Sequence, residues 1–271
     1  MKVVDSEQAA VYELMAENKI SLNYQPVINY REQKVYCIEA LLNWTVFSEE
    51  VFDTEHFISQ IENDTELSLA LDSYVLLAAT RDFSNLCQTC QYDGCLSVNI
   101  SPNSLESECF VGHLKKLFLA NEDALPLLDP SKLILEITER VPWANPDIIL
   151  EAIAELTALG VRIAVDDFIT GYANFGVLLN ENVTIVKIDR CITKRLLEQE
   201  SVRIFAEQFK ELAHHLKKTV IVEGIEESEQ ASWLDSHGYQ LFQGYFFSRP
   251  TSIEGIARYL HDRSGCIRGT Q

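Results

Sequence analysis

The residues most suited to chemistry in this sequence are two adjacent carboxylates, Asp166 and Asp167, which follow a short apolar run at residues 163–165. Neighbouring carboxylates that are partly buried make each other harder to ionise, so a cation, hydrogen bonds or solvent must stabilise the pair. Asp is also a preferred turn and helix-cap residue, so a solvated turn that caps the next helix is the simpler alternative. The rest of the sequence has to decide between these two interpretations.

Polar side chains recur at the ends of short apolar runs along the whole chain. Continuous Val/Ile/Leu runs are typical of strands that are buried on both faces, in a parallel sheet covered by helices. Besides the Asp pair, the polar residues of these runs are Tyr24, Gln25, Glu39, Asn99, Glu136, Lys187, Glu223 and Gln243.

Longer stretches with helical spacing separate the apolar runs. In the clearest of them, Asn145 is expected to cap the helix with its side chain, and Pro146 fits the first helical position. Ile148 and Ile153 belong to its apolar face and are expected to cover the sheet. Gly160 is expected to end the helix at a positive φ.

Eight strand-and-helix units in about 250 residues predict an α/β fold, a (β/α)8 TIM-like barrel. We expect one domain over residues 1–271, with its core at about residues 20–262. Catalytic groups of such barrels lie at the carboxyl ends of different strands. We therefore expect one mouth to bring together Glu39, Asn99, Glu136, Asp166, Asp167, Lys187, Glu223 and Gln243. Five carboxylates faced by one lysine would repel each other, and Mg²⁺ or Mn²⁺ with oxygen ligands is the chemistry that fits.

Net charge limits the partners of the chain. With 22 Lys+Arg against 41 Asp+Glu, the net charge of -19 repels polyanions and argues against duplex nucleic acid or a membrane surface as the main partner. No apolar run approaches the length of about 18 residues that a transmembrane helix needs. The first residues, MKVVDSEQAA, lack the pattern of a signal peptide, so a cytoplasmic location is expected.

The seven cysteines are expected to be free thiols, because their number is odd and the expected compartment is reducing. Cys87, Cys90 and Cys95 lie close together and raise the alternative of a zinc site. A zinc site needs a fourth ligand, and the sequence has no second C-x-x-C or H-x-x-x-H to supply one. Small core hydrophobes are therefore the preferred interpretation of these three residues.

In order along the chain, these motifs resemble those of the EAL-domain family of cyclic di-GMP phosphodiesterases. The family's name stands literally at Glu39-Ala40-Leu41. The further motifs are YQP at Tyr24, VNIS from Val98, LEITE at residues 135–139, DDF.TGY from Asp166, VKID from Val186, VEGIE from Val222 and QGY at Gln243. The resemblance runs from about Ser21 to about Pro250, and it implies a barrel whose first strand is antiparallel to the others.

The resemblance also implies a role for each matching residue. Glu39, Asn99, Glu136 and Asp166 would ligate one divalent cation, and Asp166, Asp167 and Glu223 a second, with Asp166 bridging. Lys187 would orient and help to deprotonate the attacking water, while Gln243 would hold that water or nearby substrate. Glu139 would anchor the loop after Asp167, which couples metal binding and dimerisation to activity. Substrate contacts would come from Gln25, Leu41, Asn43 and Gln243.

The implied reaction is hydrolysis of one phosphodiester bond of cyclic di-GMP, with two Mg²⁺ or Mn²⁺ ions, giving linear 5′-pGpG. Water bound between two cations loses its proton near pH 7, and the ions neutralise charge that builds up on the phosphate. The resemblance also makes a homodimer plausible. No sensory domain is visible in the sequence, so regulation is expected to come from expression, oligomerisation or an unidentified regulatory protein.

Two departures from the family pattern bear on substrate binding and activity. Family members usually carry arginine where this chain has Asn43, and a neutral amide cannot reproduce the two-pronged grip of arginine on phosphate. This predicts weaker substrate binding, by about 1.5 to 3 kcal/mol, and a lower Michaelis constant for Asn43→Arg. The loop also differs, with Ile169 replacing glycine, and Ala173 and Asn174 replacing serines.

Three functions therefore stay open at the level of the sequence. The preferred one is an active phosphodiesterase, because every implied metal ligand is present. The second is a catalytically weak or silent module that acts as a cyclic di-GMP receptor or docks a protein partner, because a fold does not guarantee chemistry. The third is an unrelated metal-dependent barrel enzyme.

Overall fold

The structure, a computed structural model, describes residues 11–13, 15–17, 19–43, 61, 64–119, 129–138, 143–168 and 175–266. Within these ranges eight strands close into a barrel, in which each strand lies beside the next one along the chain. The strands are β1 (Ser21–Asn29), β2 (Lys34–Asn43), β3 (Cys95–Ile100), β4 (Leu133–Ile137), β5 (Arg162–Phe168), β6 (Val183–Ile188), β7 (Thr219–Val222) and β8 (Leu241–Phe242).

Strand direction follows the expectation from the family resemblance. β1 pairs antiparallel with both β2 and β8, and all pairs from β2 to β8 are parallel. In the β1–β2 pair, Gln25 lies opposite Glu39 and Ser21 lies opposite Asn43. The beginning of β1 is therefore at the same end of the barrel as the carboxyl ends of the parallel strands.

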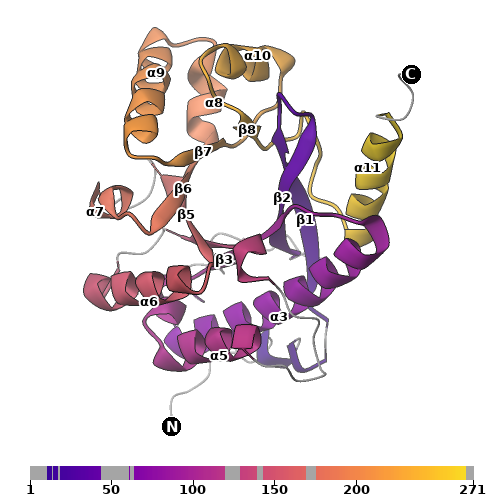
Figure 1. The fold of residues 1–271 in the computed structure, drawn as a ribbon, viewed down its shortest axis with the longest axis vertical. Helices are drawn as coiled ribbons and strands as arrows, with labels where there is room; N and C mark the ends of the chain where they lie inside the picture. The colour runs from indigo at the N-terminus through magenta and orange to yellow at the C-terminus, as the bar shows by residue number, and fades with distance from the viewer. Residues whose placement is uncertain are drawn as a thin grey trace.

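Helices form the outer layer of the barrel, as Figure 1 shows. The largest cluster of buried hydrophobic residues lies between these helices and the sheet, and strand residues such as Ile137 and Val186 contribute to it. The helices are α3 (Thr65–Cys90), α4 (Pro102–Leu105), α5 (Glu108–Leu119), α6 (Pro146–Ala158), α7 (Phe175–Leu179), α8 (Arg190–Leu196), α9 (Glu200–His215), α10 (Ser228–Ser236) and α11 (Ile253–Cys266), with a 3-10 turn, η2 (Pro130–Lys132).

Helix α6 shows where local sequence signals succeed and where they fail. Gly160 has φ 102°, as expected for the residue that ends the helix. The predicted cap was wrong, because the Asn145 side chain makes no capping bond and instead donates from Nδ2 to Glu106 Oε2 at 2.7 Å. Ile153 is fully buried, whereas Ile148, expected on the same face, is 46% exposed. A tertiary hydrogen bond has displaced the local one.

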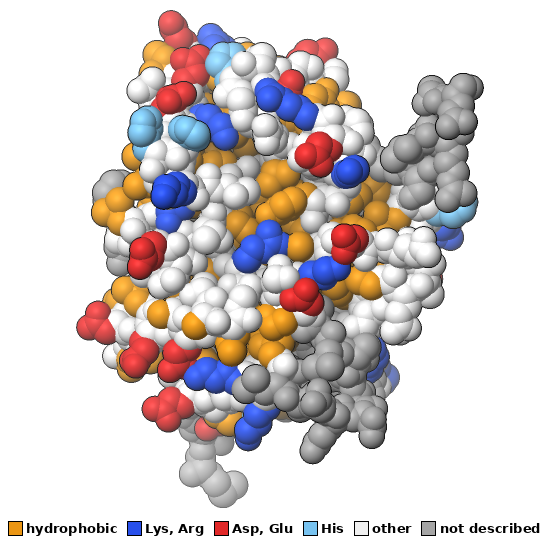
Figure 2. Space-filling model, viewed as in Figure 1, with side chains coloured by type: hydrophobic (Ala, Val, Ile, Leu, Met, Phe, Trp, Pro, Cys, Tyr) orange, Lys and Arg blue, Asp and Glu red, His pale blue; other side chains and the backbone are white. Residues whose placement is uncertain are grey.

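The remaining expectations from composition concern the surface and the cysteines. Basic and acidic side chains are interspersed on the face shown in Figure 2, with hydrophobic side chains exposed between them. No helix in the described ranges combines the length and hydrophobicity of a transmembrane span. Cys37, Cys87, Cys90, Cys95, Cys109 and Cys191 are free thiols, and the groups of possible metal ligands found among the described residues contain no cysteine.

Candidate active site

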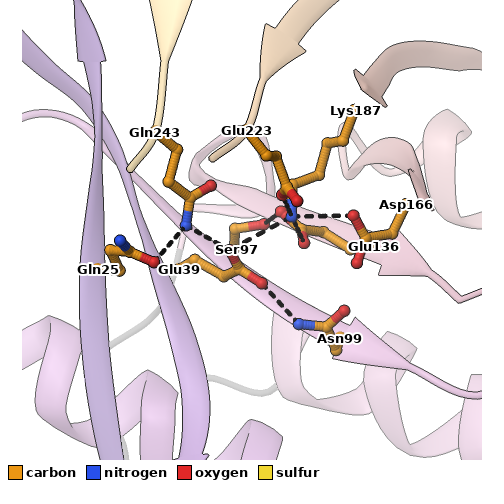
Figure 3. A network of polar contacts seen from close by, with 9 residues as sticks. All are labelled: Gln25, Glu39, Ser97, Asn99, Glu136, Asp166, Lys187, Glu223 and Gln243. Carbon is orange, nitrogen blue, oxygen red and sulfur yellow. Dashed lines mark hydrogen bonds and ion pairs between the residues drawn. The ribbon is translucent and has the colours of Figure 1, made fainter. Parts of the chain in front are cut away.

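The polar residues predicted from the strand ends do meet at one mouth of the barrel (Figure 3). Each comes from a different strand or from the residue just after it, except that β5 supplies two. They are Gln25 from β1, Glu39 from β2, Asn99 from β3, Glu136 from β4, Asp166 and Asp167 from β5, Lys187 from β6, Glu223 after β7 and Gln243 after β8. Most of them are buried, so their charges interact at low effective dielectric.

Lys187 is the cation at the centre of this mouth. Its side chain is 1% exposed, and Nζ lies 2.6 Å from oxygens of both Glu136 and Glu223. Asp166 Oδ1 at 3.1 Å and Glu39 Oε2 at 3.3 Å complete the set of four carboxylates. Burial alone would lower the pKa of Lys187, but the acidic neighbours outweigh it and hold that pKa well above its usual value. Lys187 is therefore an ammonium ion in the metal-free protein.

The carboxylates differ in how readily they ionise. Burial raises the pKa of Glu136 well above its ordinary value, and the nearby charge of Glu39 adds to the effect. Burial also raises the pKa of Glu223, to about 8, against the opposing effect of Lys187. For Glu39 the penalty of burial is outweighed by Lys187 and by hydrogen bonds, so its pKa is lowered. Without metal, the site thus keeps protons on some of its acids.

Neutral amides hold Glu39 in place from both sides. Asn99 Nδ2 donates to one of its oxygens at 2.8 Å, and Gln243 Nε2 donates to the other at 2.7 Å. The same Gln243 nitrogen lies 3.1 Å from Gln25 Oε1, and Gln25 in turn donates to Ser248 O at 2.9 Å. These contacts fix the orientation of the carboxylate, which is what a metal ligand requires of its surroundings.

A local irregularity in β5 brings both adjacent carboxylates to the mouth. In a regular strand, neighbouring side chains point to opposite faces, so only one of Asp166 and Asp167 would point inward. Here the pairing of β5 with β6 is irregular between Val165 and Phe168, and Asp167 has φ 51°. A residue in this left-handed region turns the chain, and Asp tolerates it better than most residues.

The acidic side chains form two groups that share one residue. Oxygens of Glu39, Glu136 and Asp166 lie within 4.8 Å of one another, and so do oxygens of Asp166, Asp167 and Glu223. Asp166 Oδ1 is buried and accepts no hydrogen bond, although it is close to Lys187. Five carboxylates with one ammonium carry four formal negative charges, the charge that two divalent cations balance. The donor set fits hard divalent ions with oxygen ligands.

The mouth opens into a cavity of about 830 Å³, a volume within the usual range for small-molecule sites. Predicted substrate contacts Gln25, Leu41 and Gln243 line it, together with Glu39, Asn99, Asp166, Asp167 and Glu223. Asn43 is the last residue of β2 and is not among the described lining residues. Arg190 is the only arginine or lysine among them. Glu139, Ile169, Ala173 and Asn174 lie outside the described residues, so their predicted roles stay predictions.

Two polar residues that support the site were missed in the sequence. Inside the barrel, the Ser97 hydroxyl donates a hydrogen bond to Glu136. Ser97 could have been predicted from the sequence, because it lies two residues before Asn99 and so on the same face of β3. Asp72 of α3 accepts from the backbone and hydroxyl of Ser101, both at 2.8 Å, and from Ser104 Oγ at 2.7 Å. It anchors the turn that follows Asn99, and burial raises its pKa. No motif singled out this helical Asp.

The fold and the site together define a TIM-like barrel with a cluster of acidic residues at its mouth that could hold metal ions, and comparisons with known proteins assign the family. The model of the EAL domain family matches residues 8–250, so the chain belongs to the EAL domain family.

Relatives and solved structures agree with this assignment. The chain is 30% identical over 256 residues to the oxygen sensor protein DosP of Escherichia coli, covering 93% of this chain and 31% of DosP. It is 29% identical over 237 residues to the probable cyclic di-GMP phosphodiesterase PdeN of the same organism, covering 88% and 44%. The EAL enzyme Bd1971, in its form bound to cAMP and cyclic di-GMP, superposes with a TM-score of 0.84 at 26% identity, covering 93% and 68%. The chain thus spans less than half the length of these curated relatives.

Proposed function

We propose that this chain is a metal-dependent phosphodiesterase that hydrolyses cyclic di-GMP to linear 5′-pGpG. The observation that carries the proposal is the pair of overlapping carboxylate groups that share Asp166 at the mouth of a large cavity. Family membership and the phosphodiesterase relatives support the same reaction. Family membership also removes the interpretation as an unrelated barrel enzyme.

In this proposal, Glu39, Asn99, Glu136 and Asp166 hold one Mg²⁺ or Mn²⁺ ion. Asp166, Asp167 and Glu223 hold the other. When bound, such ions bring the pKa of water from about 15.7 to near neutrality and neutralise charge on the phosphate. They also compensate the negative charge of the mouth, which would otherwise repel a dianionic substrate.

The other residues act on the substrate and on protons. As an ammonium ion, Lys187 donates hydrogen bonds, so it can orient the attacking oxygen. A role for Lys187 in deprotonation requires a lower pKa, which positive charge placed nearby would produce. Gln243 donates a hydrogen bond to Glu39 and contacts Gln25, so these two side chains keep Glu39 oriented. Together with Leu41 they also contact the substrate. Arg190 supplies positive charge in the lining of the cavity.

The predicted role of Glu139 in anchoring the loop after Asp167 belongs to the same proposal, as do a cytoplasmic location and a homodimer. Light scattering over a range of protein concentrations tests the homodimer, and a monomer throughout would contradict it. Regulation by a partner protein stays a prediction of the sequence.

One sequence observation favours a second function. Asn43 supplies a neutral amide where the family usually has arginine, and Ile169, Ala173 and Asn174 also depart from the family pattern. A protein that binds cyclic di-GMP without turning it over would fit both departures. In that case the chain would act as a receptor or as a docking module for a protein partner.

Incubation of the purified protein with cyclic di-GMP and Mn²⁺, with Glu39→Ala as the matched variant, separates these functions. Linear product that disappears in Glu39→Ala supports the phosphodiesterase. Binding of cyclic di-GMP without product, measured by calorimetry, supports the receptor. Product formed at the same rate by Glu39→Ala would contradict the proposed metal site, because this carboxylate belongs to the first group of ligands.

A further inference from the structure

Two cysteines lie side by side on neighbouring strands, just below the acidic mouth. Cys37 of β2 and Cys95 of β3 are direct partners in the parallel pairing of these strands. Cys37 belongs to an apolar cluster inside the barrel, and Cys95 packs against that cluster, so both side chains face the barrel interior. The Cα atoms of such partners are separated by the strand spacing of about 4.8 Å. A disulfide bond spans Cα separations of about 4.4 to 6.8 Å, so the backbone allows a bond between these two residues.

Cys95 is the member of the pair that a small molecule can reach. It is partly exposed, whereas Cys37 is fully buried. The Arg162 guanidinium donates a hydrogen bond to Cys95 Sγ and another to Tyr36 Oη, the latter at 2.8 Å. Burial raises the pKa of Cys95, and the charge and hydrogen bond of Arg162 act against that rise. A cation beside a sulfur favours the thiolate, which is the form that reacts with oxidants.

We propose that Cys37 and Cys95 form an oxidation site, at which a hydroperoxide converts the two thiols to a disulfide bond. In the first step, the Cys95 thiolate attacks one peroxide oxygen and the O–O bond breaks. The leaving oxygen takes up a proton, which gives a sulfenic acid and water or an alcohol. In the second step, the Cys37 thiol attacks the Cys95 sulfur, the S–O bond breaks, and the hydroxyl leaves as water with the thiol proton. Two electrons thus pass from the two sulfurs to the peroxide.

The bond would act on the acidic site from the layer below it. A relaxed disulfide holds its Cβ atoms about 3.5 to 4.5 Å apart, closer than the strand spacing, so the bond draws β2 and β3 together. Cys37 lies two residues before Glu39. Cys95 lies two residues before Ser97, which donates to Glu136. Residues two apart on a strand share a face, so the movement reaches two proposed metal ligands and weakens cation binding.

The two parts of this inference depend on different things. The bond itself does not depend on the proposed function, because it needs only the two sulfurs and a peroxide. A loss of phosphodiesterase turnover on oxidation rests on the proposed function.

Peptide mapping tests the bond directly. The full chain is treated with hydrogen peroxide, alkylated and digested without reductant, and mass spectrometry should find Cys37 joined to Cys95 until dithiothreitol is added. Cys95→Ala should abolish this product, whereas the matched control Cys90→Ala, at the last residue of α3, should keep it. By calorimetry, peroxide should weaken Mn²⁺ binding to the wild type about tenfold, as for a lost outer-shell contact, and dithiothreitol should restore it. Peroxide should leave Mn²⁺ binding to Cys95→Ala unchanged.

Other results would overturn the inference in distinguishable ways. If Cys37 is still alkylated as a free thiol after peroxide treatment, the bond does not form. A bond from Cys95 to Cys87, on the last turn of α3, would show that the pairing across the strands is wrong. An unchanged Mn²⁺ affinity in the disulfide form would refute its effect on the acidic site. If the bond forms and the reduced protein does not hydrolyse cyclic di-GMP, the proposed function is wrong and the oxidation site stands.

Discussion

Two layers inside the same barrel are built from the same strands and have opposite character. One layer is the charged mouth, and the other is a separate cluster that takes one buried apolar residue from seven of the strands. These residues are Val27, Cys37, Ile134, Ala164, Ile185, Ile221 and Leu241. Each lies two positions from a residue of the mouth, and residues two apart on a strand point the same way.

The difference between the layers shows how a barrel separates stability from chemistry. The apolar layer is stable by itself, because its side chains gain free energy simply by leaving water. The charged layer gains nothing from burial and depends on compensating cations. Lys187 supplies one cation in the metal-free protein, and the proposed metal ions would supply the others.

The largest effect should come from removing the central cation of the mouth. Lys187→Met leaves four carboxylates around a neutral side chain, so the metal-free protein should lose about 3 to 5 kcal/mol of unfolding free energy, as for other broken buried ion pairs. Urea denaturation in EDTA measures this loss. Mn²⁺ should restore much of it in the variant, and an unchanged midpoint in EDTA would mean that Lys187 does not hold the mouth together.

Two variants, at residues 221 and 223, test directly whether the apolar layer serves stability and the charged mouth serves activity. Ile221→Ala should cost about 2 to 5 kcal/mol of stability through a core cavity, with KM nearly unchanged. Glu223→Gln should lower activity at least about 100-fold, more than the loss of an outer-shell partner, without lowering the stability of the metal-free protein. Melting curves and initial rates measure both. Equal effects on stability would contradict the two-layer description.

The pH dependence of stability should depend on whether metal is present. Without metal, burial raises the pKa of Glu223 from 4.5 to about 8, so the folded state holds a proton that the unfolded state releases. This contribution to stability is complete below about pH 4.5 and is lost as the pH rises through about 8. The melting temperature in EDTA should therefore fall between pH 6 and pH 8.5. Mn²⁺ should reverse the trend, and Glu223→Gln should flatten it.

The smallest expected effect comes from a loop at the amino ends of the parallel strands, the end of the barrel opposite to the acidic mouth. Gly160 precedes β5 with φ 102°, and a Cβ there would meet only Pro130 and Ser131, at 3.7 Å. Space is available, so Gly160→Ala should cost only the conformational penalty of about 1 kcal/mol. The melting temperature should fall while KM stays the same. An altered KM would show that the two ends of the barrel are coupled.

Much of this molecule was predictable from its sequence, because the strands are continuous apolar runs and polar residues end them. That pattern indicated the barrel, and the barrel placed Glu39, Glu136, Asp166 and Lys187 together. The direction of β1 came only from the family resemblance, since hydrophobic periodicity is the same for both directions of a strand.

What the sequence could not predict depends on tertiary contacts. Two adjacent aspartates in an ideal strand would diverge, and only the irregular backbone at Asp167 brings both to the mouth. Asn145 has the sequence signature of a helix cap, yet its side chain donates a hydrogen bond to Glu106, the residue that follows α4. Asp72 looks like any polar residue of an amphipathic helix until Ser101 and Ser104 meet it.

The reversed first strand has a mechanical consequence. In an all-parallel barrel, the chain enters β1 from the end that serves stability, far from the reaction. Here Ser21 lies opposite Asn43, so the segment that leads into β1 arrives at the reactive rim, where Tyr74 Oη holds Ile20 O at 3.2 Å. A pull or twist on that segment would travel along four residues to Gln25 and through Gln243 to Glu39. The point where the chain enters the barrel is thus connected to Glu39 through β1 and two glutamine side chains.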